Sequence, residues 1–175
     1  MNVTVSQLTT QINAVKKNGL FAALQTAALN SGYRVDEEDI IDLSLAYVLA
    51  VASRETNIKN ILGDGGHGVG VIQIDTRYHD IARRMKDDDN WRTQPEVLIR
   101  YGVKMLQDNV QWAAKRWPTL TYRQHLKIAA SAYNSGRGGA QRGVAVSDCD
   151  AFTTGKDYGE DVLERMDAIT KLLTV

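Results

Sequence analysis

The sequence predicts a mainly α-helical α+β fold, built as one domain over residues 1–175 with a small β-hairpin. Apolar residues recur every three or four positions through most of the chain, which is typical of helices packed on a core. The segment 63–75 is the exception, because 63–70 holds five glycines and 69–75 is dominated by Val and Ile. That segment predicts a loop followed by a short strand or hairpin. At 175 residues the chain has the length of one domain.

Three helices are expected before the glycine-rich segment, at about 4–18, 20–31 and 36–55. The first starts at Thr4 or Ser6, whose side chains can cap it, and Asn18-Gly19 ends it. The second is rich in Ala and Leu, which are strong helix formers. The acidic run 36–39 is expected to start the third, because negative charge favours a helix amino end. The third helix is apolar nearly all round, so we expect it at the centre of the fold.

Three more helices are expected after the glycine-rich segment, at about 95–117, 121–133 and 157–173. Pro95 suits the first turn of a helix, because its missing N–H group has no partner there in any case. Thr119 or Thr121 is expected to cap the next helix. A loop with three glycines is expected at 134–139, before the last helix.

Charge and cysteine content exclude several classes of protein. The chain carries 21 basic and 21 acidic side chains, so neither nucleic acid nor an anionic membrane is an expected partner. Cys149 is the only cysteine, which excludes an internal disulfide. The first twenty residues lack the continuous apolar stretch of a signal peptide. The most apolar run, 43–52, is about half as long as a membrane span requires.

Glu55 has the setting of a catalytic acid. It directly follows the most apolar helical segment and precedes the glycine-rich loop. Burial there, together with the partially negative end of a helix, would raise the pKa of its carboxyl and keep it protonated near neutral pH. The alternative is that Glu55 only ends a helix and pairs with the neighbouring Arg54. The local sequence leaves both interpretations open.

Other motifs predict little chemistry. The glycines at 63–68 satisfy a dinucleotide-binding pattern, but that motif follows a strand and opens a helix, whereas here the order is reversed. The three histidines and Cys149 lack the short spacing of zinc sites, and 87–90 lacks the Gly and distal Glu of a calcium loop. No metal and no cofactor are expected. Trp112 and His125 are expected to have structural roles.

Four segments resemble, in order, the goose-type lysozyme family, in a phage or bacterial form. They are Ser53-Arg54-Glu55-Thr56, the run from Gly63 to Asp75 with Arg77-Tyr78-His79, the run from Ser131 to Gly136, and Asp157-Tyr158 with Asp161-Val162. The resemblance covers about 39–172, whereas 1–35 matches nothing in the family. It implies the lysozyme-like fold, with the small hairpin beside the active-site cleft.

The resemblance implies a muramidase, which hydrolyses the β-1,4 bond between N-acetylmuramic acid and N-acetylglucosamine in peptidoglycan. It makes Glu55 the general acid, and Asp64 and Asp75 the carboxylates that position and activate a water. An inverting mechanism of this kind separates acid and base by roughly 6.5–9.5 Å. The resemblance also places substrate-binding residues along the cleft: Gln73, His79, Tyr133, Asn134 and Tyr158.

Other functions stay open at this point. A lytic transglycosylase on the same fold would let the muramic 6-hydroxyl replace water and would need one glutamate, so Asp64 and Asp75 argue against it. A non-catalytic wall-binding module of a phage particle would bind glycan without cleaving it, and a chitinase or chitosanase would cut other glycans.

The resemblance further implies a monomer, with peptidoglycan as partner and a proteinaceous lysozyme inhibitor as a second candidate partner. The expected place of action is the bacterial cell wall, reached through a holin or a dedicated secretion route.

Overall fold

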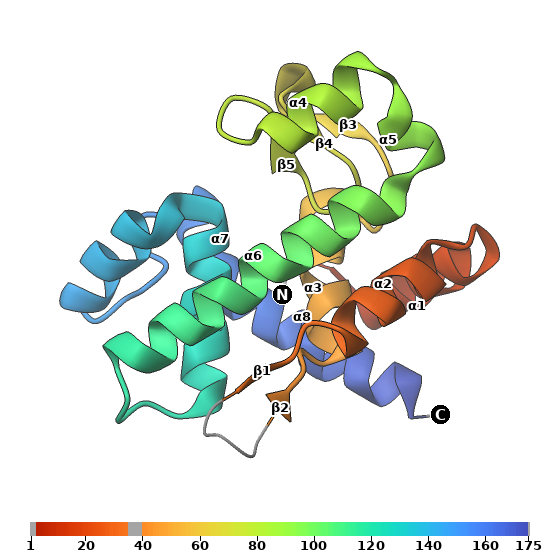
Figure 1. The fold of residues 1–175 in the computed structure, drawn as a ribbon. Helices are drawn as coiled ribbons and strands as arrows, with labels where there is room; N and C mark the ends of the chain where they lie inside the picture. The colour runs from red at the N-terminus through yellow and green to blue at the C-terminus, as the bar shows by residue number, and fades with distance from the viewer. Residues whose placement is uncertain (1–2, 35–39, 175) are drawn as a thin grey trace.

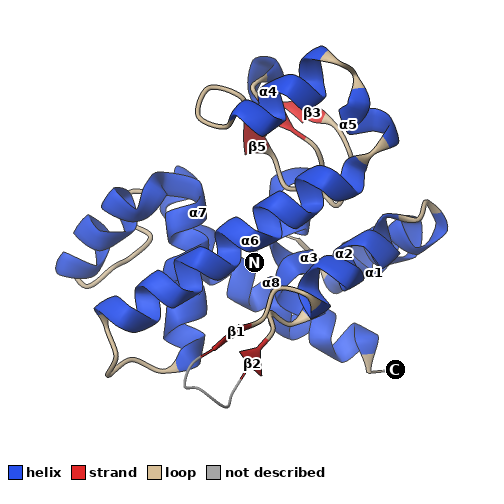
Figure 2. Cartoon of the chain, viewed as in Figure 1, coloured by secondary structure: helices blue, strands red, loops and turns tan. Residues whose placement is uncertain are grey.

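Helices form most of the chain in the computed structural model, which describes residues 3–34 and 40–174 (Figures 1 and 2). The α-helices are α1 (Val5–Lys17), α2 (Leu20–Leu29), α3 (Leu45–Thr56), α4 (Asp80–Asp87), α5 (Asn90–Thr93), α6 (Pro95–Arg116), α7 (Tyr122–Ala145) and α8 (Tyr158–Leu173). The strands are β1 (Tyr33–Arg34), β2 (Ile40–Ile41), β3 (Leu62–Gly63), β4 (Gly68–Val69) and β5 (Ile74–Asp75). The predicted mainly helical α+β class is confirmed. Within the described residues, no helix has both the length and the apolar character needed to cross a membrane.

Side-chain caps start two of the helices where the sequence predicts them. The Thr4 and Thr121 side chains each accept a hydrogen bond from the backbone N–H three residues on, at the starts of α1 and α7. A glutamine at that third position returns a bond to the capping residue, which completes a capping box at both helices. Gly19 separates α1 from α2 with a φ of 80°, a conformation that glycine adopts without a steric penalty.

The start of α3 corrects the prediction. The helix begins at Leu45, where the Ser44 side chain accepts a hydrogen bond from the backbone N–H of Tyr47. The residues before it pair instead, because β2 runs antiparallel to β1. The acidic run 36–39, which we expected at the helix start, lies outside the described residues. The centre of the fold is as predicted, since α3 is buried at nearly every position.

The glycine-rich segment folds into a three-stranded antiparallel sheet in the order β3-β4-β5, rather than the two strands of a simple hairpin. Gly68 pairs with Gly63 on one side and with Asp75 on the other. The chain reverses between β4 and β5 through Gly70 and Gln73, both at positive φ. The short helices α4 and α5 follow the sheet and were not predicted.

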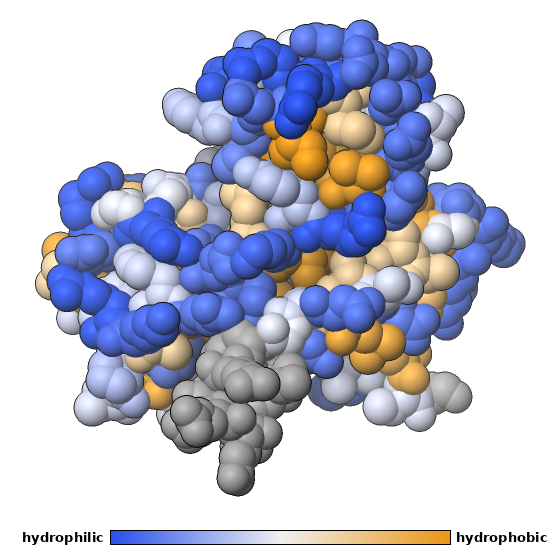
Figure 3. Space-filling view, in the orientation of Figure 1, coloured by the Kyte–Doolittle hydropathy of each residue, from blue (hydrophilic) through white to orange (hydrophobic). Residues whose placement is uncertain are grey.

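The long helix α6 crosses the front of the molecule in Figure 1, between the sheet with α4 and α5 and the rest of the fold. Its bounds and those of α8 each agree with the prediction within one residue. Hydrophilic side chains cover most of the face seen in Figure 3, with apolar ones gathered between α4, α5 and α6. The main apolar core draws buried residues from α1, α2, α3, α6 and α8.

The loop predicted at 134–139 is wrong, because helical hydrogen bonding continues to Ala145. Only Gly136 leaves helical conformation inside α7, at φ 72° and ψ 160°. Two other glycines of α7 serve close packing: a Cβ on Gly139 would lie 2.6 Å from Oγ of Ser135, and one on Gly143 would lie 2.5 Å from the carbonyl oxygen of Asp148. This end of α7 packs on a second, smaller core that includes Ala140 and Cys149.

Candidate active site

Two adjoining cavities of about 620 and 540 Å³ form a groove between the small sheet and α7. Four residues line both cavities, so the two are parts of one groove: Glu55, Gln73, Asp75 and Asn134. His79 and Tyr133 line the larger cavity, and Asp64 and Tyr158 the smaller one. The structure therefore brings together all eight residues that the sequence assigned to the site.

Glu55 sits in the last turn of α3, half-buried at the floor of the groove. The helix ends directly after it, because Asn57 and Ile58 both adopt positive φ. The Tyr158 hydroxyl donates a hydrogen bond to Oε1 of Glu55. Burial raises the pKa of the Glu55 carboxyl to about 7, although the Tyr158 hydrogen bond and the charge of Arg54 act in the opposite direction.

The pairing of Glu55 with Arg54, considered as an alternative, does not occur among the described ion pairs. Arg54 forms ion pairs with Asp157 and Asp161, each at 2.8 Å, and both carboxylates belong to the start of α8. Its guanidinium also lies over the Tyr158 ring. Arg54 thus fastens α8 against the end of α3, which keeps the Tyr158 hydroxyl at Glu55.

Asp64 and Asp75 are joined by one arginine. Nη2 of Arg77 lies 2.6 Å from Oδ2 of Asp64 and 2.6 Å from Oδ2 of Asp75. The Arg77 backbone N–H and Nε also donate to Asp75. These hydrogen bonds lower the pKa of Asp75 below its ordinary value of 3.8. A carboxylate pair held by a guanidinium therefore faces the same groove as a carboxyl with a raised pKa.

The position of the Gln73 side chain explains why residues 63 and 68 are glycines. Its side chain lies over the Gly63–Gly68 pair, where a Cβ on either glycine would come within 2.1 or 2.2 Å of its Oε1 atom. Nε2 of Gln73 donates to the carbonyl oxygens of Ile61 and Gly70. The glycines therefore make room for a side chain that lines the groove, in addition to forming the turn.

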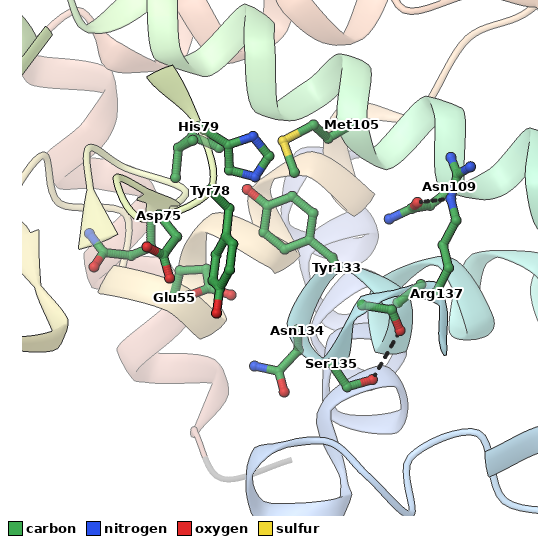
Figure 4. Close-up of a pocket in the computed structure, with 14 residues that line it drawn as sticks. Glu55, Asp75, Tyr78, His79, Met105, Asn109, Tyr133, Asn134, Ser135 and Arg137 are labelled. Carbon is green, nitrogen blue, oxygen red and sulfur yellow. Dashed lines mark hydrogen bonds between the residues drawn. The ribbon is translucent and has the colours of Figure 1, made fainter. Parts of the chain in front are cut away.

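The remaining predicted residues are held by defined contacts. The Tyr133 hydroxyl donates to the carbonyl oxygen of Ile72, and Oδ1 of Asn134 accepts from the backbone N–H of Thr154. Nδ1 of His79 lies 3.0 Å from the Tyr101 hydroxyl. These contacts fix the side chains on opposite walls of the groove (Figure 4).

Several residues that line the groove had no predicted role, and three of them are charged or aromatic: Arg77, Tyr78 and Arg137. Arg77 stands two positions after Asp75, in a turn where the Asp75 side chain accepts from the Arg77 backbone N–H, and an aspartate often bonds the backbone two residues on, so a signal was available. Tyr78 is 79% exposed at the groove and lies inside a segment that the resemblance had singled out. Arg137 falls in the stretch predicted as a loop, so nothing local indicated that it lines the groove.

Residues 3–34 and 40–174 contain no group of three His, Cys, Asp or Glu side chains that could hold a metal ion. His125 is structural, as expected, because it is buried with Nε2 at 2.8 Å from the carbonyl oxygen of Trp117. Trp112 packs edge-on against Trp117, in the smaller core.

Comparison with known proteins gives a consistent result. A sequence model of the family described as lysozyme g matches residues 33–168. Lysozyme g of Gallus gallus is 35% identical over 124 residues, which cover 69% of this chain and 54% of that protein. Lysozyme G of Dromaius novaehollandiae is 32% identical, with 69% and 55% covered. Lysozyme g of Takifugu rubripes is 29% identical over 171 residues, with 91% and 87% covered. The chain spans a little over half the length of the two avian relatives.

Proposed function

The chain belongs to the lysozyme g family, and from this premise we propose that it is a peptidoglycan hydrolase that cleaves the β-1,4 bond between N-acetylmuramic acid and N-acetylglucosamine. One observation carries the proposal: Glu55, with a pKa of about 7, shares a groove with two carboxylates held by Arg77. A glycosidase needs one protonated carboxyl as acid and one ionised carboxylate as base at the same pH. It therefore requires two environments that give its carboxyl groups different pKa values.

Glu55 is the proposed general acid. A carboxyl with a pKa of about 7 is largely protonated at pH 6 and about half protonated at pH 7, so it can deliver a proton to the glycosidic oxygen as the bond breaks. Once that proton has left, the Tyr158 hydrogen bond stabilises the carboxylate. Tyr158 thus favours the deprotonated form of Glu55, the form that the proton transfer leaves behind.

Asp64 and Asp75 are the proposed residues that position and activate the attacking water. Arg77 keeps Asp75 ionised, because its hydrogen bonds lower the pKa of that carboxyl. An inverting reaction requires room for water on the face of the sugar opposite the acid. Asp64 comes from the short 3-10 turn between β3 and β4, Asp75 from β5 and Glu55 from α3, so separate elements set the width of the groove.

The groove walls are proposed to bind the glycan. His79, Tyr133, Asn134 and Gln73 present polar groups beside apolar surface, which suits the alternating hydroxyl and C–H faces of a pyranose ring. No cofactor takes part in the proposed reaction. We further propose a single catalytic domain that acts as a monomer on the bacterial cell wall, in a phage or a bacterium, with a proteinaceous inhibitor as a second partner.

The test is a digest of purified peptidoglycan by the wild-type protein and by Glu55→Gln, with the products analysed by mass spectrometry. We expect new reducing ends from the wild type and at least a 1000-fold loss of rate in the variant, since the general acid is gone. Products ending in 1,6-anhydromuramic acid would instead identify a lytic transglycosylase. Binding without any cleavage would identify a non-catalytic wall-binding module.

A further inference from the structure

Arg137 differs from the other arginines that line the groove. Arg54 pairs with two carboxylates of α8, and Arg77 with the two aspartates of the sheet. Arg137 lines the larger cavity, and within the described residues no carboxylate lies within ion-pair distance of it. Its nearest acidic neighbour along α6, Asp108, pairs with Lys104 at 2.8 Å. One end of the groove therefore carries a positive charge that the described residues do not neutralise.

The Arg137 guanidinium is held in place by α6. Nε donates to Oδ1 of Asn109, and Nη2 donates to the carbonyl oxygen of Asp108, each at 2.9 Å. The group also lies over the Trp112 ring, 5.5 Å from its centroid. Figure 4 shows Arg137 reaching from α7 to Asn109, on the wall facing Asp75 and Tyr78. Nη1 has no hydrogen-bond partner among the described residues, so a fixed cation presents free donors.

The break in α7 accounts for this placement. Gly136 takes φ 72° and ψ 160°, values that a residue with a side chain rarely adopts, and the helix resumes directly after it. A Cβ at Gly136 would meet no atom within 4 Å, so its backbone conformation is the reason for glycine there. The turn directs the chain so that Arg137 reaches α6 across the end of the groove.

We propose that Arg137 binds a carboxylate of the muramyl residues, so that the groove distinguishes acidic peptidoglycan from neutral glycans. The inference rests on the proposed function, because it assigns a substrate group to the same groove. N-acetylmuramic acid carries a lactyl carboxyl that N-acetylglucosamine lacks. A guanidinium pairs with a carboxylate through two parallel hydrogen bonds when two neighbouring N–H groups are free. In Arg137 the Nε and Nη2 atoms already donate to α6, so we expect one hydrogen bond to the carboxylate, from Nη1. The carboxylate comes either from the lactyl group or from the peptide attached to it.

Binding measurements on the Glu55→Gln protein test the proposal without cleavage. Its affinity is measured by calorimetry for chitohexaose, for glycan strands freed of peptides, which expose lactyl carboxylates, and for strands with peptides intact. The same ligands are then measured with Arg137→Gln or Arg137→Lys added. We expect Arg137→Gln to weaken binding of a carboxylate-bearing strand about tenfold, the size of one exposed charged hydrogen bond, and to leave chitohexaose binding unchanged. Arg137→Lys should retain part of the affinity.

Arg142→Gln is the matched control. Arg142 is on the same helix, lies over the Phe152 ring and does not line either cavity of the groove. Its loss removes the same charge and should leave every affinity unchanged. Weaker binding of peptide-free strands supports the lactyl carboxylate as ligand, and weaker binding of peptide-bearing strands alone supports a peptide carboxylate.

Two results would overturn the proposal: equal weakening of chitohexaose and acidic strands, which would indicate a packing role, or no weakening of any ligand. The wall digest gives a separate answer about catalysis. If wild-type protein cleaves nothing while acidic strands still bind through Arg137, then the proposed function fails and the carboxylate site stands.

Discussion

Tyr158 donates its hydroxyl hydrogen bond to Glu55 across 103 positions of the sequence, which joins the first turn of α8 to the last turn of α3. Tyr158 is buried, so it has two opposed effects on its partner. Its ring helps to exclude water from the Glu55 carboxyl, which raises the pKa, and its hydroxyl stabilises the carboxylate, which lowers the pKa. Burial is the larger effect, and the pKa settles at about 7.

The pH dependence of activity should follow from this balance. We expect kcat/KM to fall as the pH rises above about 7, where Glu55 loses its proton. Tyr158→Phe removes the hydrogen bond that favours the charged form, so the basic limb should move to higher pH. The profile is measured on soluble glycan strands. Tyr133→Phe is the comparison, because the Tyr133 hydroxyl donates to a backbone carbonyl, and its basic limb should stay in place.

The ionised form of Glu55 should lower the free energy of unfolding at alkaline pH. Its folded-state pKa of about 7 exceeds the ordinary value of 4.5, so the proton-linked stability is complete below pH 4.5 and is lost as the pH rises through 7. The free energy of unfolding of Glu55→Gln should therefore equal that of the wild type near pH 4 and exceed it by about 2 kcal/mol at pH 8. One pKa unit corresponds to about 1.4 kcal/mol, and the expected difference is reduced because Glu55 is partly solvated.

Urea denaturation at both pH values checks the Glu55→Gln prediction. Glu96→Gln, at an exposed position of α6, removes the same charge and should change stability little at either pH. An equal difference between wild type and Glu55→Gln at pH 4 and pH 8 would show that Glu55 is not buried in protonated form.

Arg77 should set the acidic limb of the activity profile. Arg77→Gln removes the hydrogen bonds that lower the pKa of Asp75, so that pKa should rise and activity should begin to fall at higher pH than in the wild type. We expect the loss of kcat/KM relative to the wild type to be largest near pH 4, around the ordinary pKa of 3.8 to which Asp75 returns, and to be small at pH 7. The melting temperature should change little, because the ion pairs are exposed. Arg83→Gln, which breaks an exposed pair with Asp80 on α4, should leave the profile unaltered. An unshifted acidic limb in Arg77→Gln would contradict the assignment of Asp75.

Gly68 and Gln73 should be energetically coupled. Gly68→Ala places a Cβ 2.2 Å from Oε1 of Gln73, so the side chain must leave and lose its two hydrogen bonds. We expect a loss of about 1–3 kcal/mol in the free energy of unfolding. In a Gln73→Ala background the same change should cost much less. Denaturation of the four proteins of this double-mutant cycle gives the coupling, and strictly additive effects would contradict the contact.

Gly138→Ala provides the control for the added methyl group. A Cβ there would have only Arg142 Nη1 nearby, at 3.6 Å. Because Ala is the better helix former, this change should leave stability unchanged or raise it by up to about 1 kcal/mol.

Local chemistry made much of the helical framework predictable. Thr4 and Thr121 cap their helices through side-chain hydrogen bonds to residues three positions away, and Pro95 suits a first turn wherever it occurs. Such contacts join residues that are close together in the sequence, so a local pattern predicts them. The start of α3 and the continuation of α7 were predicted wrongly, because β1–β2 pairing and the packing of Ala140 in one core with Ala113 of α6 act between segments that local patterns treat separately.

The order of residues was enough to predict the apolar α3, the placement of Glu55 at its end, the glycine-rich segment that carries Asp64 and Asp75, and the family resemblance. Tertiary structure alone decided that Arg54 turns to α8, that Tyr158 meets Glu55, and that Arg137 reaches α6 at the end of the groove. The physical reason is that a pKa and a binding surface depend on which groups exclude water and which charges come near. Those neighbours are brought together by packing between helices that lie far apart along the chain.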